Sequence, residues 1–272
     1  MKKQLSILVM ALMCSLSLTY AQTKETRNVG TFTKISFRVP GKLYLRQGSP
    51  QKVEIEGKKD ILEEIETEVN GNRLVIGKEN GWMNWSWGNN DEVTVYITVK
   101  DLEGISVNGS GDVIGETKIM ARDLDLNVSG SGNLKIEIDA TGNVEGDVSG
   151  SGDMHVKGKC GSFESDVSGS GKVVLAMSIA NRADFGISGS GKIEASGTAS
   201  DVKASISGSG KILAANLETN RCEIRISGSG DIEINVKNEI DATISGSGTV
   251  SYKGNPNKIN SHSSGSGKVR KM

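Results

Sequence analysis

The sequence has few of the residues that stabilise compact domains by other means. It contains 3 cysteines, 3 prolines, 4 phenylalanines, 4 tyrosines and 2 histidines in 272 residues. So few cysteines exclude a disulfide scaffold, and so few aromatic side chains suit a narrow repeating core better than a large globular one. The formal net charge is −1, so no strong attraction to nucleic acid or acidic lipid is expected.

Glycine, in contrast, is abundant, with 35 residues, and much of it falls in a repeated four-residue phrase. The first copy is the near match Asn108-Gly109-Ser110-Gly111. Eight copies read Ser-Gly-Ser-Gly and begin at Ser129, Ser149, Ser168, Ser188, Ser207, Ser227, Ser245 and Ser264. Successive copies lie 18 to 21 residues apart. A fixed period in this range is typical of a solenoid.

The residues around the phrase indicate strands. The position before it is valine or isoleucine in every copy but the last, and apolar and polar residues alternate after it, as in Leu134, Ile136 and Ile138. Alternation of apolar and polar residues with a period of two, together with many β-branched side chains, predicts β-strands. We therefore predict an all-β fold, a right-handed parallel β-helix of about nine coils of 18–21 residues with an N-terminal β-rich cap. At about 4.8 Å per coil the rod would be roughly 40 Å long.

Each coil is expected to turn sharply at its Gly-Ser-Gly corner and more loosely half a coil later. Stepping by two from Ile206 through Gly208 and Gly210 reaches Ile212, which places both glycines inward and the serines outward. The looser turns are predicted at three places, residues 140–143, 196–199 and 253–256.

Residues 1–21 have the features of a secretory signal peptide. Lys2 and Lys3 precede an apolar run, and Ala21 offers a cleavage site. A membrane anchor is the alternative, but the run is short and contains serine. Cys14 raises lipidation as another alternative, although Met13 is larger than the residue such a signal requires. We expect cleavage after Ala21 and an exported protein in the periplasm, at the outer-membrane surface or outside the cell, with no transmembrane segment in the mature chain.

The mature chain, residues 22–272, is predicted to be one domain, in which residues 22–104 cap the coils of residues 105–272. The cap region alternates over 31–39, 42–46, 52–56 and 93–99. Asn70-Gly71 predicts a two-residue hairpin, and Asp60 with Glu63 resembles a capping box at the start of a helical turn.

A series of motifs in this region resembles a known family. The motifs are Phe32-Thr33-Lys34-Ile35, Gly41 to Gly48, Val53 to Gly57, Ile65 to Val69 and Leu74-Val75-Ile76, followed by the Gly-Ser-Gly coils. This order is similar to that of the head GIN domain family, named for autotransporter adhesins and abundant in Bacteroidetes. The resemblance implies a right-handed β-helix, export and an adhesive role, and supplies no catalytic residues. Because no C-terminal membrane barrel follows the coils, we do not expect self-export.

All three tryptophans, Trp82, Trp85 and Trp87, lie between two predicted strands. They are the candidate contact for a partner chain or a glycan, because exposed indoles stack on sugars and pack at interfaces. The alternative is that they fold back and close the end of the core.

Several other signals are set aside. Residues 186–192 match a phosphate-binding loop, but Ile193 stands where the hydroxyl ligand of magnesium is needed. Asp112, Asp153 and Asp231 follow the phrase as in calcium repeats, but other copies carry lysine there, which cannot bind calcium. These positions are better explained by charge pairing between coils, for example Asp153 beside Lys172 and Lys211 beside Asp231. We expect no metal and no cofactor.

Cys160 and Cys222 are predicted to be free, since they lie three coils, or roughly 14 Å, apart and a disulfide needs about 7 Å. Cys222 has inward parity, and Cys160 is placed in a turn.

His155 and His262 have no nucleophile or metal constellation beside them in sequence, and no coil has the long insertion that forms a catalytic cleft. The sequence therefore predicts a non-catalytic exported adhesin or envelope scaffold, which contacts a protein, a glycan or a second copy of itself. The alternative is a carbohydrate-binding or carbohydrate-active envelope protein.

Overall fold

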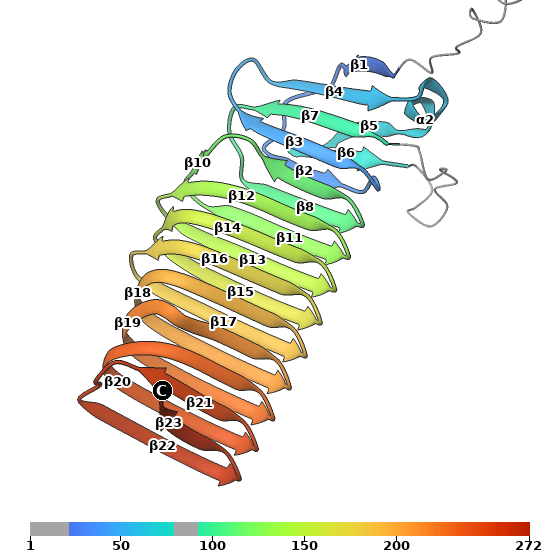
Figure 1. Cartoon of the computed structure of the whole chain (residues 1–272). Coiled ribbons are helices and arrows are strands. Elements are labelled where there is room, and N and C mark those ends of the chain that lie inside the picture. The colour runs from blue at the N-terminus through green and yellow to red at the C-terminus, as the bar shows by residue number, and fades with distance from the viewer. Residues whose placement is uncertain (1–21, 79–91) are drawn as a thin grey trace, which may run out of the picture.

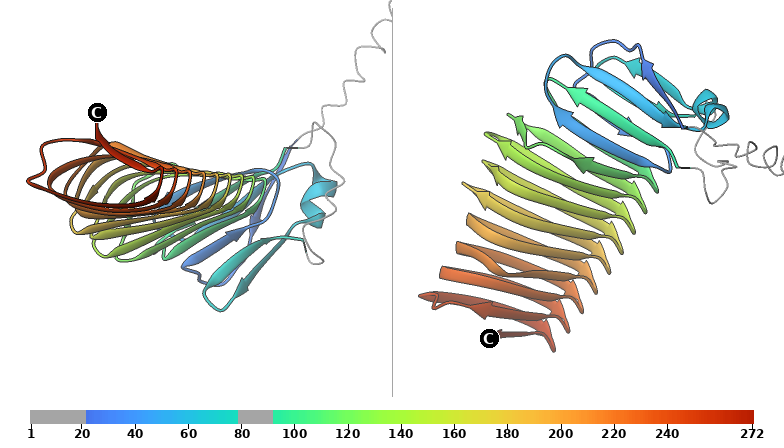
Figure 2. Two further views of the ribbon diagram at one scale, coloured as in Figure 1. Left: turned by 90° about the horizontal axis from the view of Figure 1, so that it is seen from below. Right: turned by 45° about the horizontal axis from the view of Figure 1, so that its top comes forward.

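The computed structural model describes residues 22–78 and 92–272, in which strands stack into a parallel β-solenoid of about eight turns (Figure 1). The predicted β-helix is thereby confirmed, because nine corners enclose eight complete turns. The predicted signal peptide and the tryptophans Trp82, Trp85 and Trp87 lie outside the described residues. Viewed from below, the rod is flattened into two layers (Figure 2).

Each turn contains one strand that enters the Gly-Ser-Gly corner and one that leaves it. We call the two layers the entry layer and the exit layer. Entry strands are β8 (Gly104–Gly109), β11 (Leu124–Gly130), β13 (Asn143–Gly150), β15 (Ser162–Gly169), β17 (Arg182–Gly189) and β22 (Lys258–Gly265). Exit strands are β9 (Asp112–Gly115), β12 (Asn133–Ala140), β14 (Asp153–Cys160), β16 (Lys172–Ile179), β21 (Thr249–Lys253) and β23 (Lys268–Lys271), with the short β10 (Ile119–Ala121) pairing with β12.

Three long strands run from the exit layer into the entry layer without a break: β18 (Lys192–Gly208), β19 (Lys211–Gly228) and β20 (Asp231–Gly246). The loose turn predicted at 196–199 is therefore wrong. Gly197, with φ 113°, and a register shift between Glu194 and Ser196 bend β18 instead. The turns near 140–143 and 253–256 are confirmed, since β12 ends at Ala140 and β21 at Lys253.

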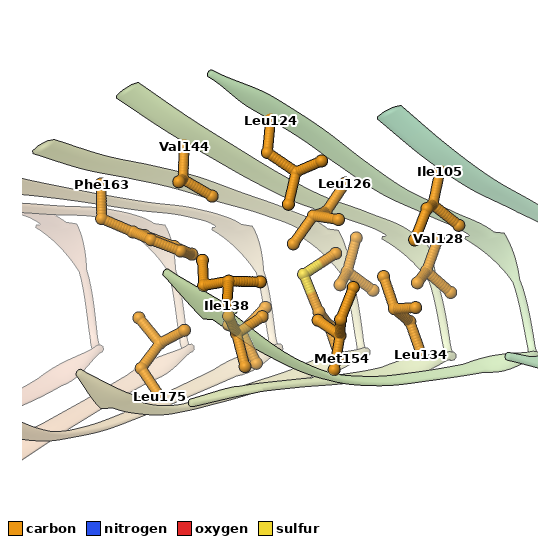
Figure 3. Packing of buried hydrophobic residues seen from close by; sticks show 14 of the residues in the cluster. Ile105, Leu124, Leu126, Val128, Leu134, Ile138, Val144, Met154, Phe163 and Leu175 are labelled. Carbon is orange, nitrogen blue, oxygen red and sulfur yellow. The ribbon is translucent and has the colours of Figure 1, made fainter. Parts of the chain in front are cut away.

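The core is a set of apolar columns in exact register between coils. Val128 pairs with Val148, which pairs with Val167, and Val167 pairs with Ile187. In Figure 3 the side chains of the entry layer point toward those of the exit layer, including Leu134 and Met154. Alternate residues are buried because a solenoid of two thin layers can shield only one face of each strand.

The corner explains the glycine phrase, with one correction. Ser207 and Ser209 are exposed and Gly210 is buried, as predicted. A Cβ on Gly210 would lie 2.5 Å from Cγ2 of Ile187 in the core. Gly208 does not face the core: its φ is 126° and an added Cβ would lie 2.5 Å from the carbonyl oxygen of Gly189 in the preceding coil. Gly210 is thus required by core packing, and Gly208 by its backbone conformation and by its contact with the preceding coil.

The N-terminal region contributes coils of its own. Strands β2 (Lys34–Phe37) and β3 (Lys42–Gln47) pair in parallel with β8 and β9, and β6 (Arg73–Gly77) and β7 (Thr94–Val99) pair in parallel with β2 and β3. Outside them lie the antiparallel strands β1 (Thr23–Arg27), β4 (Lys52–Gly57) and β5 (Glu66–Asn70).

Helix α2 (Lys59–Glu64) lies at this end of the rod and buries Ile61 and Leu62 (Figure 2). The helical turn and the hairpin at Asn70-Gly71 are confirmed. The capping box is wrong, because the N-cap residue is Lys58 and no side chain caps the helix. Together the helix and the antiparallel strands cover the end of the apolar columns, as a solenoid requires.

Cys160 and Cys222 are free, as predicted, and Cys222 is buried, also as predicted; Cys160 is buried as well. The placement of Cys160 in a turn is wrong: it is the last residue of β14 and pairs with Ile179 of the next coil. Burial raises the pKa of the Cys160 thiol to about 12 and also raises the pKa of Cys222.

Candidate interaction surfaces

The corners form a polar column along one edge of the rod. The outward positions on either side of the first glycine are serines in successive coils, and they are exposed at Ser207, Ser209 and their equivalents. Their backbone is satisfied between coils: the amide of Ser209 donates to Gly189 at 2.9 Å, and the amide of Ser229 donates to Gly208 at 2.9 Å. The column therefore presents mainly hydroxyl groups to solvent.

The strands that flank the predicted tryptophan site lie at the head of this column. β6 ends at Gly77 and β7 begins at Thr94, and these strands are in register with β2 and β3. Residues 38–41 form the corner between β2 and β3, next to the corner at Asn108 to Gly111. The segment that carries Trp82, Trp85 and Trp87 thus connects two strands at the position where other coils have a corner, and its own residues are outside the described part.

The outer face of the entry layer carries a band of carboxylates that sequence reasoning missed. We call Asp125, Glu145, Asp147, Glu164 and Asp166 the acidic band. Asp125, Glu145 and Glu164 occupy one column, and the amide of Asp166 donates to Asp147 at 3.1 Å. Repulsion from Asp147 is the main cause that raises the pKa of Glu145, while burial mainly raises that of Asp147. Of these five carboxylates, only Asp125 forms an ion pair with another described residue, Lys34, at 2.8 Å.

Farther along the same face, a groove of about 440 Å³ is lined by alternating cations and carboxylates. The guanidinium of Arg221 donates to Asp201 at 2.8 Å and lowers the pKa of that carboxyl, and Lys258 lowers the pKa of Glu239 in the same way. These carboxylates are ionised and paired, which makes them poor proton donors near neutral pH.

A second groove, of about 570 Å³, lies on the side opposite the corners. It is lined by Lys34, Leu102, Arg122, Asp123, Asp139 and the 56% exposed Met120, among others. It forms where the chain leaves the regular path between β9 and β11. The longest interval between phrases, 21 residues from Asn108 to Ser129, is the sequence signal that could have located it.

The other predicted surface features are placed as follows. Lys211 pairs with Asp231 at 3.0 Å between coils, as predicted. Asp153 is in register with Lys172, but the ammonium of Lys172 bonds Glu194 at 3.0 Å instead. His155 is exposed on β14 and His262 on β22.

Among residues 22–78 and 92–272, no group of three or more His, Cys, Asp or Glu side chains is arranged to hold a metal ion. Nor does this described part contain a helix that is long and apolar enough to cross a membrane.

The chain is similar to several solved structures of bacterial proteins. A "putative lipid binding protein" from Parabacteroides distasonis is 23% identical, with a TM-score of 0.69 over 93% of this chain and 98% of that one. A "putative adhesin" from Parabacteroides merdae is 20% identical, with a TM-score of 0.70 over 93% and 97%. Another from Bacteroides fragilis is 24% identical, with a TM-score of 0.53 over 93% and 98%. At these identities the likeness shows the fold alone, and no curated protein matches the chain.

The family model described as "Putative auto-transporter adhesin, head GIN domain" matches residues 31–192 and 174–256. These ranges cover most of the N-terminal cap and every Gly-Ser-Gly corner except the last, at residues 264–267. The chain therefore belongs to the head GIN domain family.

Proposed function

We propose that this chain is an exported, non-catalytic adhesion scaffold of the cell envelope, released from its signal peptide after Ala21. The observation that carries the proposal is the regular solenoid itself. Its interior is filled by apolar side chains such as Phe163 and Phe185, and its grooves are shallow, charged and on the surface. Such a rod offers extended surfaces for contact with another macromolecule.

The family description and the neighbours named as adhesins support this role, whereas lipid binding, which the name of one neighbour states, has less support here. A lipid chain requires an apolar cavity. The two grooves described above are instead lined with carboxylates, lysines and arginines. Residues 22–272 would act as a single unit, with residues 22–104 capping the coils of 105–272.

Within this role, we place partner contact at Trp82, Trp85 and Trp87. The flanking strand β6 ends, and β7 begins, at the N-terminal head of the corner column, on the outer side of the first regular corner at residues 108–111. Indole side chains favour contact with a partner protein or a glycan surface, and all three tryptophans of the chain lie in this one segment.

Protease treatment of intact cells tests the location, because a surface protein is digested and a periplasmic one is protected until the outer membrane is opened. Attachment tests the contact: purified protein should compete with cells for their surface, and replacement of the three tryptophans by alanine should abolish competition. The matched control is replacement of exposed corner serines Ser190, Ser209 and Ser229 by alanine. Protection in intact cells, or equal competition by the tryptophan variant, would contradict the proposal.

A further inference from the structure

The two ends of the rod carry opposite charge. Beyond Asp241 the chain has no acidic residue, and residues 242–272 contain five cations, Lys253, Lys258, Lys268, Arg270 and Lys271. Four of them lie in β22 and β23, the last two strands, and all five are exposed. Lys258 is held by Glu239 at 2.6 Å, which leaves an excess of positive charge at this end.

At the other end α2 and β5 carry a local excess of negative charge. They contain one cation, Lys59, and five acidic residues. These are Asp60, Glu63, Glu64, Glu66 and Glu68, all of them exposed. Glu64 pairs with Lys78 at 3.1 Å, and the other four form no ion pair with any residue of the described part.

The same two places are the free edges of the entry layer. In the described part, β22 pairs only with β20, and β5 pairs only with β6. A strand edge that lacks a neighbour presents unpaired amides and carbonyls and can accept another strand. The C-terminal edge is also polar: Ser261 and Ser263 take the inward positions that Ala242 and Ile244 take one coil earlier, and Ile259 is 42% exposed. A partner at this end would therefore be held by charge and strand pairing more than by apolar contact.

From this arrangement we propose that the protein associates head to tail, with the basic C-terminal end (β22 and β23) of one copy against the acidic N-terminal end (α2 and β5) of the next. Charge selects a second copy in this orientation, because two C-terminal ends repel each other and so do two N-terminal ends. β5 runs antiparallel to β6, so β22 of a coaxial copy would meet it as an antiparallel strand. A contact between different surfaces does not close on itself, and it produces linear chains of rods rather than dimers.

The inference goes beyond the proposed adhesive function and does not depend on it. Single exposed ion pairs contribute little, so the association should be weak and strongly dependent on salt. Sedimentation velocity in about 0.01 M salt, where the screening length is about 30 Å, should show species that grow past two copies as concentration rises. In about 1 M salt, where the screening length is about 3 Å, the protein should be monomeric.

Charge reversal gives the decisive test. The tail variant Lys268→Glu/Arg270→Glu/Lys271→Glu changes the net side-chain charge of residues 242–272 from +5 to −1, so that both ends are acidic. The head variant Asp60→Lys/Glu66→Lys/Glu68→Lys changes the net charge of α2 and β5 from −4 to +2, so that both ends are basic. Each alone should remain monomeric at low salt, and an equimolar mixture should assemble again, which also shows that both variants are folded. The matched control, Lys157→Glu/Lys159→Glu in the middle of the rod, should assemble as the native protein does.

Monomer at every concentration in low salt would overturn the proposal. So would association that stops at two copies, or association that the tail variant retains on its own.

Discussion

The corner makes a specific energetic prediction, because its two glycines should fail for different reasons. We consider Gly208→Ala, Gly210→Ala and, between them, the matched control Ser209→Ala. Ser209 is exposed and already has a Cβ, so its loss of a hydroxyl should change the free energy of unfolding by less than about 0.5 kcal/mol.

The cost at Gly208 comes from the backbone. Its φ of 126° is a conformation that costs about 1–3 kcal/mol for other residues. The added Cβ also meets the carbonyl oxygen of Gly189, which accepts the amide of Ser209, and displacing it sacrifices about 0.5–1.5 kcal/mol. The sum is about 2–4 kcal/mol, or a fall of roughly 4–16 °C in Tm for a chain of this size.

The cost at Gly210 comes from the core. A Cβ there overlaps Cγ2 of Ile187, a β-branched side chain that cannot rotate away, and such overpacking costs about 1–3 kcal/mol. Ile187→Ala removes that atom. Its own cavity destabilises the protein, but the double variant with Gly210→Ala should be more stable than the sum of the single costs by about 1–2 kcal/mol. The same Ile187→Ala should not rescue Gly208→Ala.

Urea unfolding followed by circular dichroism measures these differences, with hydrogen exchange of the neighbouring coils as a check, since long repeat arrays can unfold in parts. The reasoning would be refuted if Gly208→Ala were as stable as Ser209→Ala, or if Ile187→Ala rescued both glycine variants equally.

Three further predictions concern polar groups and thiols. Thr219→Val should destabilise the fold by about 1–3 kcal/mol in urea unfolding, because the buried hydroxyl donates to the carbonyl of Ser200 at 2.9 Å and valine has no donor to replace it; an unchanged midpoint would contradict this. Cys160 and Cys222 should not react with a disulfide reagent at pH 8 in the folded protein and should react fully in denaturant, because with a pKa of about 12 only roughly one Cys160 thiol in ten thousand is ionised. The folded state binds the proton of Glu145 more tightly than the unfolded state does, so this group lowers stability as pH rises through its raised pKa. Glu145→Gln should therefore raise Tm by about 1–2 °C at pH 7 and have no effect at pH 3, and the same shift at both values would show that charge is not the cause.

The sequence was sufficient to predict the repeating part of this fold because the repeat makes local pattern and global structure agree. Val128, Val148 and Val167 show the alternation of a strand, and their spacing is that of the coil, so secondary structure and register follow from the same residues. The misplaced details are those in which tertiary contacts override local signals. Gly208 has inward parity, yet its positive φ directs an added Cβ toward the preceding coil. Residues 196–199 look like a turn but lie within β18.

The surfaces were less predictable, because they arise from residues that are distant in sequence. Glu145 and Glu164 are adjacent only through coil stacking, and the groove at Met120 is formed with residues near Lys34 and Leu102. Sequence reasoning identified single outward charges, but not which of them share a face. It singled out the tryptophans by composition, and their structure lies outside the described residues.

The position of the tryptophan segment still has a physical basis in the described coils. From Gly130 onward, a Cβ on the first corner glycine would meet a carbonyl of the preceding corner, whereas one on Gly109 meets nothing within 4 Å. The corner before Gly109, residues 38–41, contains Val39 and Pro40 and no residue with positive φ. The stacking constraint on the first glycine of the phrase thus begins only where one regular corner lies on another, whereas an added Cβ on the second glycine, Gly111, would already meet the carbonyl oxygen of Val39. β6 and β7 belong to the outermost coil, so a connection between them has no regular corner to match and can take a different length and composition. A solenoid that must keep its inner coils uniform can vary at this end without disturbing the core, and this is where its sequence departs most from the repeat.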